Sequence, residues 1–391
     1  MSTILTPDAL RALERPTGYA VGLPRQAFTS QAFLDDELAR VFAPTWIYAG
    51  AASAIPEPGD TLPAMIGNAP VVLVRGRDGA VRAFHNICRH RAALVVTEPG
   101  TKRTSLVCPY HGWTYDLDGG LLRTPHIGGT GKHTCEGIDR GNLGLKPVRC
   151  NSWGGLLFVN LSGEAPPLAD HLRPLADRWS AYDVSRFRYA GSIDYTLACN
   201  WKLAVENYLE SYHLPWVHPS LNSYSRLDDH YMFEAGTVAY GQVTTVYAPN
   251  LACGLTLPSL DGLDAATRAR AEYPVIFPSL LVGLQCDHFY VINVVPLAPD
   301  RTFERFDLFY VDGVGSDDRL APARVETRDR WNAVFVEDVG IVESAQRGRG
   351  SPAMDGGRFS AHQDALVHLF EKSVARLVAA PPSARTGQMS A

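Results

Sequence analysis

The feature that constrains this chain most is a pair of short segments that each carry one cysteine and one histidine. Cys88 and His90 form the first pair, and after 17 intervening residues Cys108 and His111 form the second. Thiolate and imidazole are ligands for zinc and for iron. Zinc fingers usually place two cysteines on one arm and two histidines on the other. The mixed arms therefore favour a two-iron cluster in which one iron takes both thiolates and the other takes both imidazoles, with structural zinc as the alternative.

The chemistry of such a cluster suits an electron acceptor. Neutral imidazoles in place of thiolates remove negative charge and raise the reduction potential, so a reductase can deliver electrons to it. Pro109 and Gly112 fit a tight second loop around the cluster. Tyr115 is placed to donate a hydrogen bond to a ligand sulfur, which would tune the metal site.

Changes of periodicity divide the 391 residues into three zones. Ser30 to Ala43 has apolar residues at helical spacing and Ser30 as the N-cap, so residues 1–43 are a helical lead-in. Residues 44–162 contain short β-rich segments separated by turn residues, which predict a small antiparallel β domain. Residues 163–391 mix long strands with late helices, the last around 362–379, and predict an α+β domain whose sheet is mostly antiparallel. Its strands are EAGTVAYGQVTTVYA, LLVGLQCDHFYVINVVPL and TFERFDLFYVDG, and LAPDRT is a short hairpin connection.

A second group of candidate metal ligands lies in the third zone. A helix is predicted from Asn200 to about Tyr212, and the following Leu214-Pro215 turn can bring His213 and His218 to one metal ion. Two histidines and one carboxylate make the three-ligand face of non-haem iron(II) oxygenases. The best candidate carboxylate is Asp338, with Glu337 and Glu343 as alternatives. A polar histidine pair without a metal is the competing interpretation.

The two arms, CRH and CPYHGW, resemble those of a Rieske [2Fe-2S] domain. Nearly the whole chain, from LPRQAFTS and FAPTWIYAG to QRGRGSP and GRFSAHQ, resembles the large (alpha) subunit of Rieske-type non-haem iron ring-hydroxylating oxygenases. The resemblance implies a helix-grip catalytic domain, an antiparallel sheet plus a long helix, after the Rieske domain. It implies a homotrimer in which the cluster of one subunit passes electrons to the mononuclear iron of the next. By position it implies His213, His218 and Asp338 as the iron ligands.

Glu210 departs from the commonest family pattern. The resemblance places it where most members have an aspartate that bridges a cluster histidine of the neighbouring subunit to an iron-ligating histidine. The same glutamate occurs in the branch that resembles carnitine monooxygenase, stachydrine demethylase and glycine betaine monooxygenase. A glutamate still offers two oxygens that accept hydrogen bonds from imidazole N–H groups. We therefore interpret Glu210 as the group that couples the two metal sites.

Together these features predict the terminal oxygenase component of a multicomponent enzyme. A ferredoxin or a flavin/[2Fe-2S] reductase would bring electrons from NAD(P)H, and O2 would be the co-substrate. The favoured reaction is monooxygenation of a small organic substrate, by hydroxylation or oxidative N-demethylation, with quaternary ammonium compounds as one substrate class. The alternatives are an aromatic ring-hydroxylating dioxygenase giving cis-dihydrodiols, a Rieske electron carrier without catalytic iron, and a zinc-binding scaffold.

Composition excludes several other classes. The formal net charge is −5 and no long basic run occurs, so a nucleic-acid partner has no electrostatic support. No run approaches the roughly 18 apolar residues that span a bilayer, and the N-terminus lacks a signal peptide, so we expect a cytoplasmic protein. No glycine-rich dinucleotide fingerprint follows a strand, and the chain itself is therefore not expected to bind NAD or flavin.

Several residues have weaker functional interpretations. Basic side chains in or near the cluster arms suit docking of an acidic reductase, although a charge run of this size is more often a solvated face: Arg89, Arg91, Lys102 and Arg103. Aromatic residues that suit a cation-binding pocket, or else the core, are Tyr208, Tyr212, Trp216, Tyr224, Phe289 and Tyr290. The remaining cysteines are expected to be buried small hydrophobes: Cys135, Cys150, Cys199, Cys253 and Cys286. His85 is not assigned a role.

Overall fold

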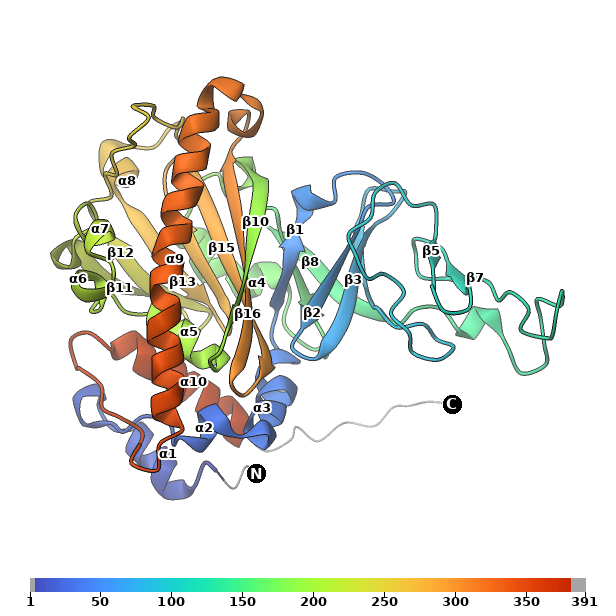
Figure 1. The fold of residues 1–391 in the computed structure, drawn as a ribbon, viewed down its shortest axis with the longest axis horizontal. Coiled ribbons are helices and arrows are strands. Elements are labelled where there is room, and N and C mark those ends of the chain that lie inside the picture. The colour runs from blue at the N-terminus through green and yellow to red at the C-terminus, as the bar shows by residue number, and fades with distance from the viewer. Residues whose placement is uncertain (1–3, 381–391) are drawn as a thin grey trace.

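The computed structural model describes residues 4–380. Figure 1 shows a larger part built of helices and a sheet, with a smaller β part beside it. All neighbouring strands are antiparallel, in three sheets. None of the helices between residues 4 and 380 combines the length and apolar character that crossing a membrane requires.

The smaller part contains two sheets. A six-stranded sheet has the order β1-β9-β8-β4-β3-β2, and a three-stranded sheet, β5-β6-β7, lies at its outer end (Figure 1). A two-residue turn joins β2 to β3, and its first residue, Gly67, has a φ of +57°, which a glycine adopts without strain. The strands are β1 (Ile47–Ala51), β2 (Thr61–Ile66), β3 (Ala69–Arg75), β4 (Val81–His85), β5 (Leu106–Val107), β6 (Thr114–Tyr115), β7 (Leu121–Arg123), β8 (Pro147–Trp153) and β9 (Leu156–Asn160).

The larger part is a seven-stranded sheet, in the order β10-β16-β15-β14-β13-β12-β11, with the long helix α9 lying across one face (Figure 1). Its strands are β10 (Phe187–Leu197), β11 (His230–Ala235), β12 (Ala239–Thr244), β13 (Ala271–Ile276), β14 (Leu280–Leu284), β15 (His288–Ala298) and β16 (Arg301–Val311). Its helices are α4 (Leu168–Arg178), α5 (Trp201–Tyr208), α6 (Leu214–Val217), α7 (Pro219–Asn222), α8 (Ala265–Ala269), α9 (Ala321–Arg349) and α10 (Ala365–Ala379).

The N-terminal segment packs beneath the larger part, near α10 (Figure 1). It contains α1 (Pro7–Leu13), α2 (Gln26–Thr29), α3 (Gln31–Glu37) and a π-helical turn (Leu38–Phe42). Short 3₁₀ turns occupy Thr17–Tyr19, Ala52–Ala54, Arg140–Asn142, Val184–Arg186, Leu227–Asp229, Val314–Ser316 and Asp318–Leu320. The predicted N-cap of the lead-in helix is confirmed, because the Ser30 hydroxyl accepts a hydrogen bond from the Phe33 amide at 3.4 Å.

Three sequence predictions of elements need correction. The helix from Asn200 ends at Tyr208 rather than about Tyr212, because the Leu209 amide bonds to both the Val205 and Glu206 carbonyls and closes the last turn. Two of the three long predicted strands are interrupted by hairpin turns: EAGTVAYGQVTTVYA contains the end of β11 and all of β12, and LLVGLQCDHFYVINVVPL contains β14 and nearly all of β15. The short connection LAPDRT is confirmed as the hairpin between β15 and β16. The boundaries after residues 43 and 162 stay predictions.

The cysteine prediction also needs correction. Of the five cysteines outside the two arms, Cys199 alone is buried. Cys135, Cys150 and Cys286 are partly buried, and Cys253 is exposed. Cys253 lies in the long loop after β12, where its amide donates to the Glu326 carboxylate at 3.0 Å. Its backbone is therefore fixed while its side chain remains at the surface.

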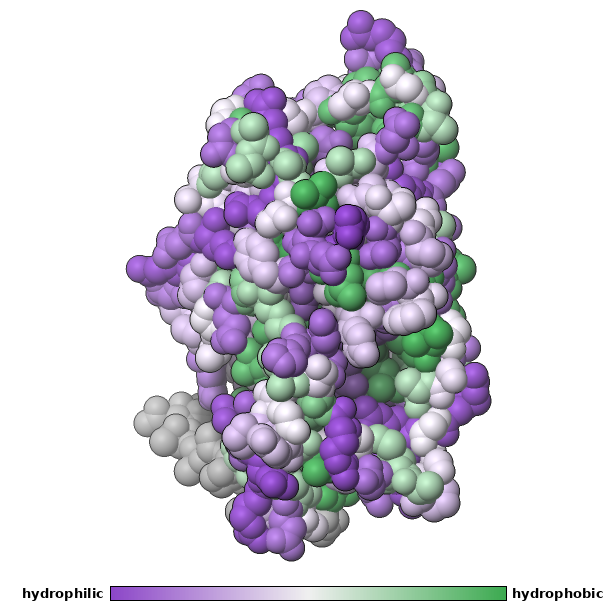
Figure 2. Space-filling model, turned by 90° about the vertical axis from the view of Figure 1, so that its left-hand side faces the viewer, coloured by the Kyte–Doolittle hydropathy of each residue, from purple (hydrophilic) through white to green (hydrophobic). Residues whose placement is uncertain are grey.

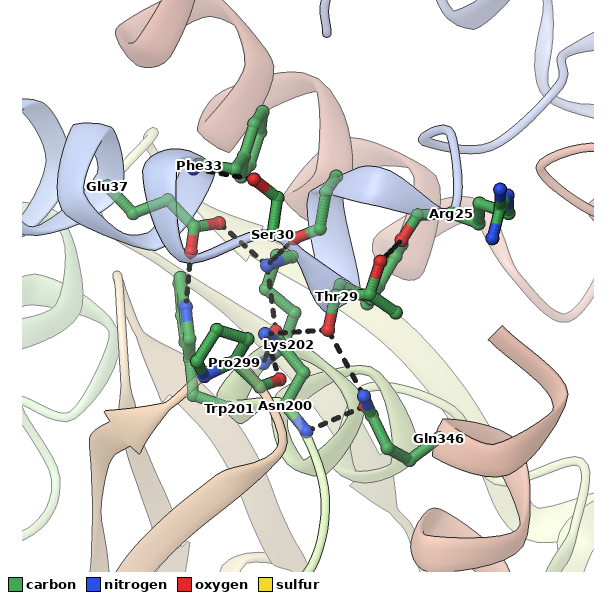
Figure 3. Close-up of polar contacts among 12 residues, drawn as sticks. Arg25, Thr29, Ser30, Phe33, Glu37, Asn200, Trp201, Lys202, Pro299 and Gln346 are labelled. Atoms are coloured by element: carbon green, nitrogen blue, oxygen red, sulfur yellow. Dashed lines mark hydrogen bonds and ion pairs between the residues drawn. The ribbon is translucent and has the colours of Figure 1, made fainter. Parts of the chain in front are cut away.

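A buried ion pair fixes the start of α5, the helix that leads to the second metal site. Figure 3 shows Lys202 pointing between the lead-in helices toward Glu37, and the Nζ–Oε1 distance is 2.7 Å. Both side chains are fully buried. Burial raises the pKa of Glu37 and lowers the pKa of Lys202, and the mutual attraction opposes both shifts. Further hydrogen bonds from Lys202 to the Ala27 carbonyl and to Asn200, the N-cap of α5, complete the network.

Candidate metal centres

The two cysteine-histidine arms form a matched pair of tight turns. In the first arm the Ala92 amide bonds to the Cys88 carbonyl at 3.0 Å, and in the second the Gly112 amide bonds to the Cys108 carbonyl at 3.0 Å. Ala92 and Gly112 occupy equivalent positions and both have positive φ, +60° and +68°. The left-handed conformation explains the glycine of the second arm, and it strains the alanine of the first. The repeated turn presents one cysteine and one histidine from each arm on the same side.

The four side chains of the arms converge. Cys88 and Cys108 are buried free thiols, and the rings of His90 and His111 lie 4.6 Å apart. The Nδ1 atom of His90 is buried without a hydrogen-bond partner. Such an atom carries a desolvation cost unless a ligand satisfies it. Two adjacent thiols, two adjacent imidazoles and one unsatisfied ring nitrogen fit a two-iron cluster better than a packed core.

Two buried aromatic residues, Tyr115 and Trp113, contact the ligand side chains Cys88 and His90. The Tyr115 hydroxyl lies 3.3 Å from the Cys88 sulfur and accepts a hydrogen bond from the Arg89 amide at 2.9 Å. Its remaining proton is therefore free to reach the sulfur, as the sequence predicts. The Trp113 ring stacks on His90 at a centroid distance of 4.9 Å, which leaves the opposite edge of His90 partly exposed.

The second candidate centre is formed where α5, α6 and α9 meet. Glu210 begins the turn after α5, and its carboxylate accepts hydrogen bonds from the backbone amide of His213 at 3.1 Å and from the ring Nδ1 at 2.5 Å. This double contact directs the Nε2 atom of His213 toward Asp338 of α9, at 3.7 Å from Oδ1. Pro215 lies in the first turn of α6, which returns the chain so that His218 reaches the same carboxylate.

His218 completes a three-residue group. Its Nε2 atom lies 2.9 Å from the Asp338 Oδ1 atom, and one ligand atom from each of His213, His218 and Asp338 falls within 4.8 Å of the other two. The Nδ1 atom of His218 contacts Glu337 at 2.7 Å. In each histidine, Nδ1 contacts a carboxylate and Nε2 points toward Asp338, where a metal ion would be held. A hydrogen bond from Nδ1 fixes the tautomer that leaves Nε2 free to ligate a metal.

The alternative carboxylates have other partners. Glu337 contacts Nδ1 of His218, the ring nitrogen that faces away from Asp338. Glu343 accepts a hydrogen bond from the Ala198 amide at 2.9 Å. Asp338 is thus the acidic residue that the structure brings to both histidines. Although burial favours the neutral ring, the hydrogen bonds to Asp338 and Glu337 raise the pKa of His218. Behind the site, burial raises the pKa of Glu304 to about 8, and the nearby charge of Asp338 adds to the shift.

A cavity that encloses about 510 Å³, part of it open to solvent, lies beside His213, His218 and Asp338. Five aromatic residues line it: Tyr208, Tyr273, Tyr290, Trp331 and Phe335. The rest of the wall is aliphatic (Leu214, Leu221 and Val334) or polar (Asn207, Ser211, Ser225, His230 and Gln242). Of the aromatic residues predicted from sequence, Tyr208 and Tyr290 line the cavity and Tyr224 lies next to it. Phe289 packs in the core, and Tyr212 and Trp216 are exposed.

The sequence reasoning missed the aromatic residues that α9 contributes. Trp331 and Phe335 precede Asp338 by seven and three residues, so all three lie on one helix face. That spacing is a signal that the sequence does contain. Around the first centre, the structure places Arg91, Lys102 and Arg103 at the surface, whereas Arg89 is partly buried and bonds to the Gly144 carbonyl.

Comparison with known families matches both parts of the chain. The Rieske [2Fe-2S] domain matches residues 45–134, and the ring hydroxylating alpha subunit (catalytic domain) matches residues 184–380. The chain belongs to the Rieske non-haem iron oxygenase alpha subunits. It is therefore an enzyme that carries a Rieske cluster and a mononuclear iron and uses O2, with electrons supplied by a reductase as is typical of the family. The electron-carrier and zinc alternatives are excluded.

Its relatives include monooxygenases and their oxygenase subunits. The glycine betaine monooxygenase oxygenase subunit of Chromohalobacter salexigens is 30% identical over 374 residues, covering 86% of this chain and 81% of the relative. Choline monooxygenase, chloroplastic, of Arabidopsis thaliana is 29% identical, covering 88% and 80%. The carnitine monooxygenase oxygenase subunit of Acinetobacter baumannii is 26% identical, covering 83% and 84%.

Solved structures confirm the predicted fold class. The quaternary ammonium Rieske monooxygenase CntA in complex with L-carnitine matches with a TM-score of 0.79 and 22% identity, covering 94% of this chain and 98% of that one. Naphthalene 1,2-dioxygenase from Rhodococcus sp. matches with a TM-score of 0.77 and 20% identity, covering 96% and 99%. The fold is therefore a Rieske β domain followed by an antiparallel sheet with a long helix.

Proposed function

We propose that this oxygenase monooxygenates a quaternary ammonium compound, by hydroxylation or by oxidative N-demethylation. The observation that carries the proposal is the aromatic cavity beside His213, His218 and Asp338. Aromatic faces attract a quaternary ammonium group by cation–π interaction, which strengthens when water is excluded. The relatives named for glycine betaine, choline and carnitine support the same substrate class.

The metal ligands follow from the two converged groups. We assign Cys88 and Cys108 to one iron of the cluster, and His90 and His111 to the other. His213, His218 and Asp338 are assigned to the mononuclear iron. When bound, the cluster supplies electrons singly and the iron supplies the capacity to activate O2. The chain's own contribution is to fix the ring nitrogens through Glu210 and Glu337 and to keep the cavity apolar beside them.

The arrangement of the chain supports electron transfer between subunits. Figure 1 shows β5 and β7, which flank the cluster arms, at the opposite end of the molecule from α6 and α7. Transfer within one chain would have to cross the whole protein, whereas a neighbour's cluster can approach α6 directly. The surface there is suited to a contact, since Tyr212 is 54% and Trp216 is 82% exposed. Figure 2 shows this face, where hydrophobic residues reach the surface at several places among polar ones.

Glu210 lies where such a contact would form. Its Oε1 atom contacts the His213 ring, and its side chain, two residues before the exposed Tyr212, is itself 15% exposed. A histidine of the neighbouring cluster can donate to the same carboxylate, which links the two centres through one side chain. In a closed ring of subunits, every cluster lies against the iron site of the next subunit, and no cluster or iron site is left without a neighbour. We propose that this ring is a homotrimer.

The electron donor would approach the opposite end. His90 and His111 are partly exposed, and the exposed Arg91 gives the surface beside them a positive charge. Lys102 and Arg103 are also exposed, but their backbone amides bond to Asp60 and Gly59 in a different loop. The surface beside the two histidines fits an acidic ferredoxin or the [2Fe-2S] module of a flavin reductase that draws electrons from NAD(P)H.

The test is product analysis with iron-loaded protein, a surrogate reductase, NADH and a panel of betaines, choline and simple aromatics. Mass spectrometry should show substrate plus one oxygen, or the demethylated amine together with formaldehyde. The Asp338→Ala variant serves as the control and should form neither. Ring dihydroxylation of an aromatic compound, with no oxidation of any quaternary ammonium compound, would overturn the proposal in favour of the dioxygenase alternative.

A further inference from the structure

A group of unsatisfied polar atoms lies beside the aromatic cavity, away from the metal site. In the described part of the chain, the Tyr247 and Tyr273 hydroxyls, both amide atoms of Gln285 and the Nε atom of Arg330 are buried without hydrogen-bond partners. A buried donor or acceptor without a partner costs free energy, so native proteins rarely retain several together. Five such atoms in one place indicate a missing ligand.

The contacts show that these residues form one group. The rings of Tyr247 and Tyr273 each lie 6.1 Å from Trp331, which lines the cavity. The Arg330 guanidinium lies over Tyr224, 5.5 Å from the ring centre, and its charge acts on both tyrosine hydroxyls. Gln285 lies beside the Tyr273 hydroxyl without completing a hydrogen bond.

The carboxylates nearby are already engaged. Glu326, one helical turn before Arg330, accepts hydrogen bonds from the amides of Ala252 and Cys253. Asp287 contacts His288 at 2.7 Å, and Glu337 contacts His218. Arg330 forms no ion pair with any residue between 4 and 380. The group is thus a cation with hydroxyl and amide groups and, among residues 4–380, no anion within ion-pair distance of it, which is the chemistry that binds a carboxylate.

The position of the group relates it to the metal site. Asp338 and Arg330 both lie on α9, eight residues apart, which is about 12 Å along the helix axis. Between them Phe335 and Trp331 present their rings to the cavity, and Tyr290 lies 4.7 Å from Trp331. Of the four residues of the group, Tyr273 also lines the cavity, so a substrate whose ammonium group lies against the rings would extend its anionic group past Tyr273 toward Arg330.

We propose that Arg330, with Tyr247, Tyr273 and Gln285, binds the anionic group of a zwitterionic substrate, a carboxylate in the simplest case. The inference rests on the proposed function and narrows it. Among quaternary ammonium compounds, those with a carboxylate are the substrates, and alcohols of the same size are not. Arg330 is then the residue that determines this specificity.

Calorimetric titration of iron-loaded protein with glycine betaine and with choline tests the proposal without requiring turnover. Wild type should bind glycine betaine more tightly than choline. Arg330→Gln should weaken glycine betaine binding by about 10- to 100-fold, the range for hydrogen bonds to a charged group, and change choline binding less than about twofold. Arg328→Gln is the matched control, because Arg328 is on the same helix, exposed and paired with Asp329; it should change neither affinity.

Tyr273→Phe provides a second variant that keeps the ring and removes one hydroxyl. It should weaken glycine betaine binding by about 3- to 10-fold and leave choline unaffected. Equal weakening of both compounds in Arg330→Gln and Tyr273→Phe, or no weakening of either, would overturn the anion site while leaving the proposed function intact. If wild type binds neither compound and no other quaternary ammonium compound such as L-carnitine, the proposed function fails and the inference fails with it.

Discussion

Replacing Asp307 with asparagine should stabilise the protein, and increasingly so as the pH rises. Asp307 is 3% exposed on β16, where it accepts a hydrogen bond from the Tyr48 hydroxyl of β1 at 2.7 Å. Burial raises the pKa of Asp307 from its ordinary 3.8 to about 6. Because the folded-state pKa is the higher one, ionisation of Asp307 lowers the free energy of unfolding. This cost is absent below pH 3.8, grows as the pH rises through 6 and is constant above that range.

The magnitude follows from the shift. Above pH 6 the full difference of roughly 2 pKa units costs about 3 kcal/mol, and at pH 5 the cost is about 1.6 kcal/mol. Asparagine keeps an oxygen for the Tyr48 hydroxyl and carries no charge. For a chain of this length the entropy of unfolding is about 0.8 kcal/mol/K. The Tm of Asp307→Asn should therefore exceed that of wild type by about 2 °C at pH 5 and about 4 °C at pH 8.

Thermal unfolding of both proteins across pH 5 to 8 measures the difference directly, since other titrating groups affect both equally. Asp228→Asn is the control, because Asp228 is 79% exposed in side-chain area and the same change there should leave Tm unaltered. A difference that stays constant with pH, or a variant less stable than wild type at pH 8, would refute the reasoning.

Three further variants test the two centres and their support. Glu210→Gln should retain both metals by iron analysis and lose at least about 100-fold in product formation, because a neutral amide cannot accept from imidazoles on both sides; normal turnover would contradict the bridging role. Lys202→Met should lower the free energy of unfolding by about 3–5 kcal/mol in urea titrations, because it leaves the Glu37 carboxylate buried without its cation. The double variant Lys202→Met with Glu37→Leu removes both charges and should recover most of that loss. Tyr115→Phe should lower the cluster's reduction potential by on the order of 40 mV in voltammetry, through loss of a hydrogen bond to the Cys88 sulfur, and an unchanged potential would count against that bond.

Features of the fold and site that are local in sequence could be predicted. The cluster arms could be predicted because each pair of ligands lies within one turn of the chain. His213 and His218 could be predicted because Leu214 and Pro215 force a turn between them. Asp338 lies 120 residues after His218, so no local spacing links it to the histidines or separates it from Glu337 and Glu343. The structure gives a physical reason for the choice, because Asp338 faces both Nε2 atoms while Glu337 faces the other side of His218.

Features that depend on tertiary contacts could not be predicted. The end of α5 at Tyr208 is decided by the shared hydrogen bonds of the Leu209 amide, and no breaker residue marks it. The residues of the anion site come from β13, the loops after β12 and β14, and α9, so no local pattern brings Tyr247, Gln285 and Arg330 together. The exposure of Cys253 likewise depends on how the loop after β12 is held by Glu326.

The most direct test of the account is the metal content of wild type beside Asp338→Ala. Wild type should contain about three irons and two acid-labile sulfides per chain, two irons for the cluster and one for the second site. Asp338→Ala should contain about two irons and two sulfides with an unchanged spectrum of the reduced cluster. Three irons in the variant, or zinc in place of iron at either centre of the wild type, would contradict the assignment of the two metal sites.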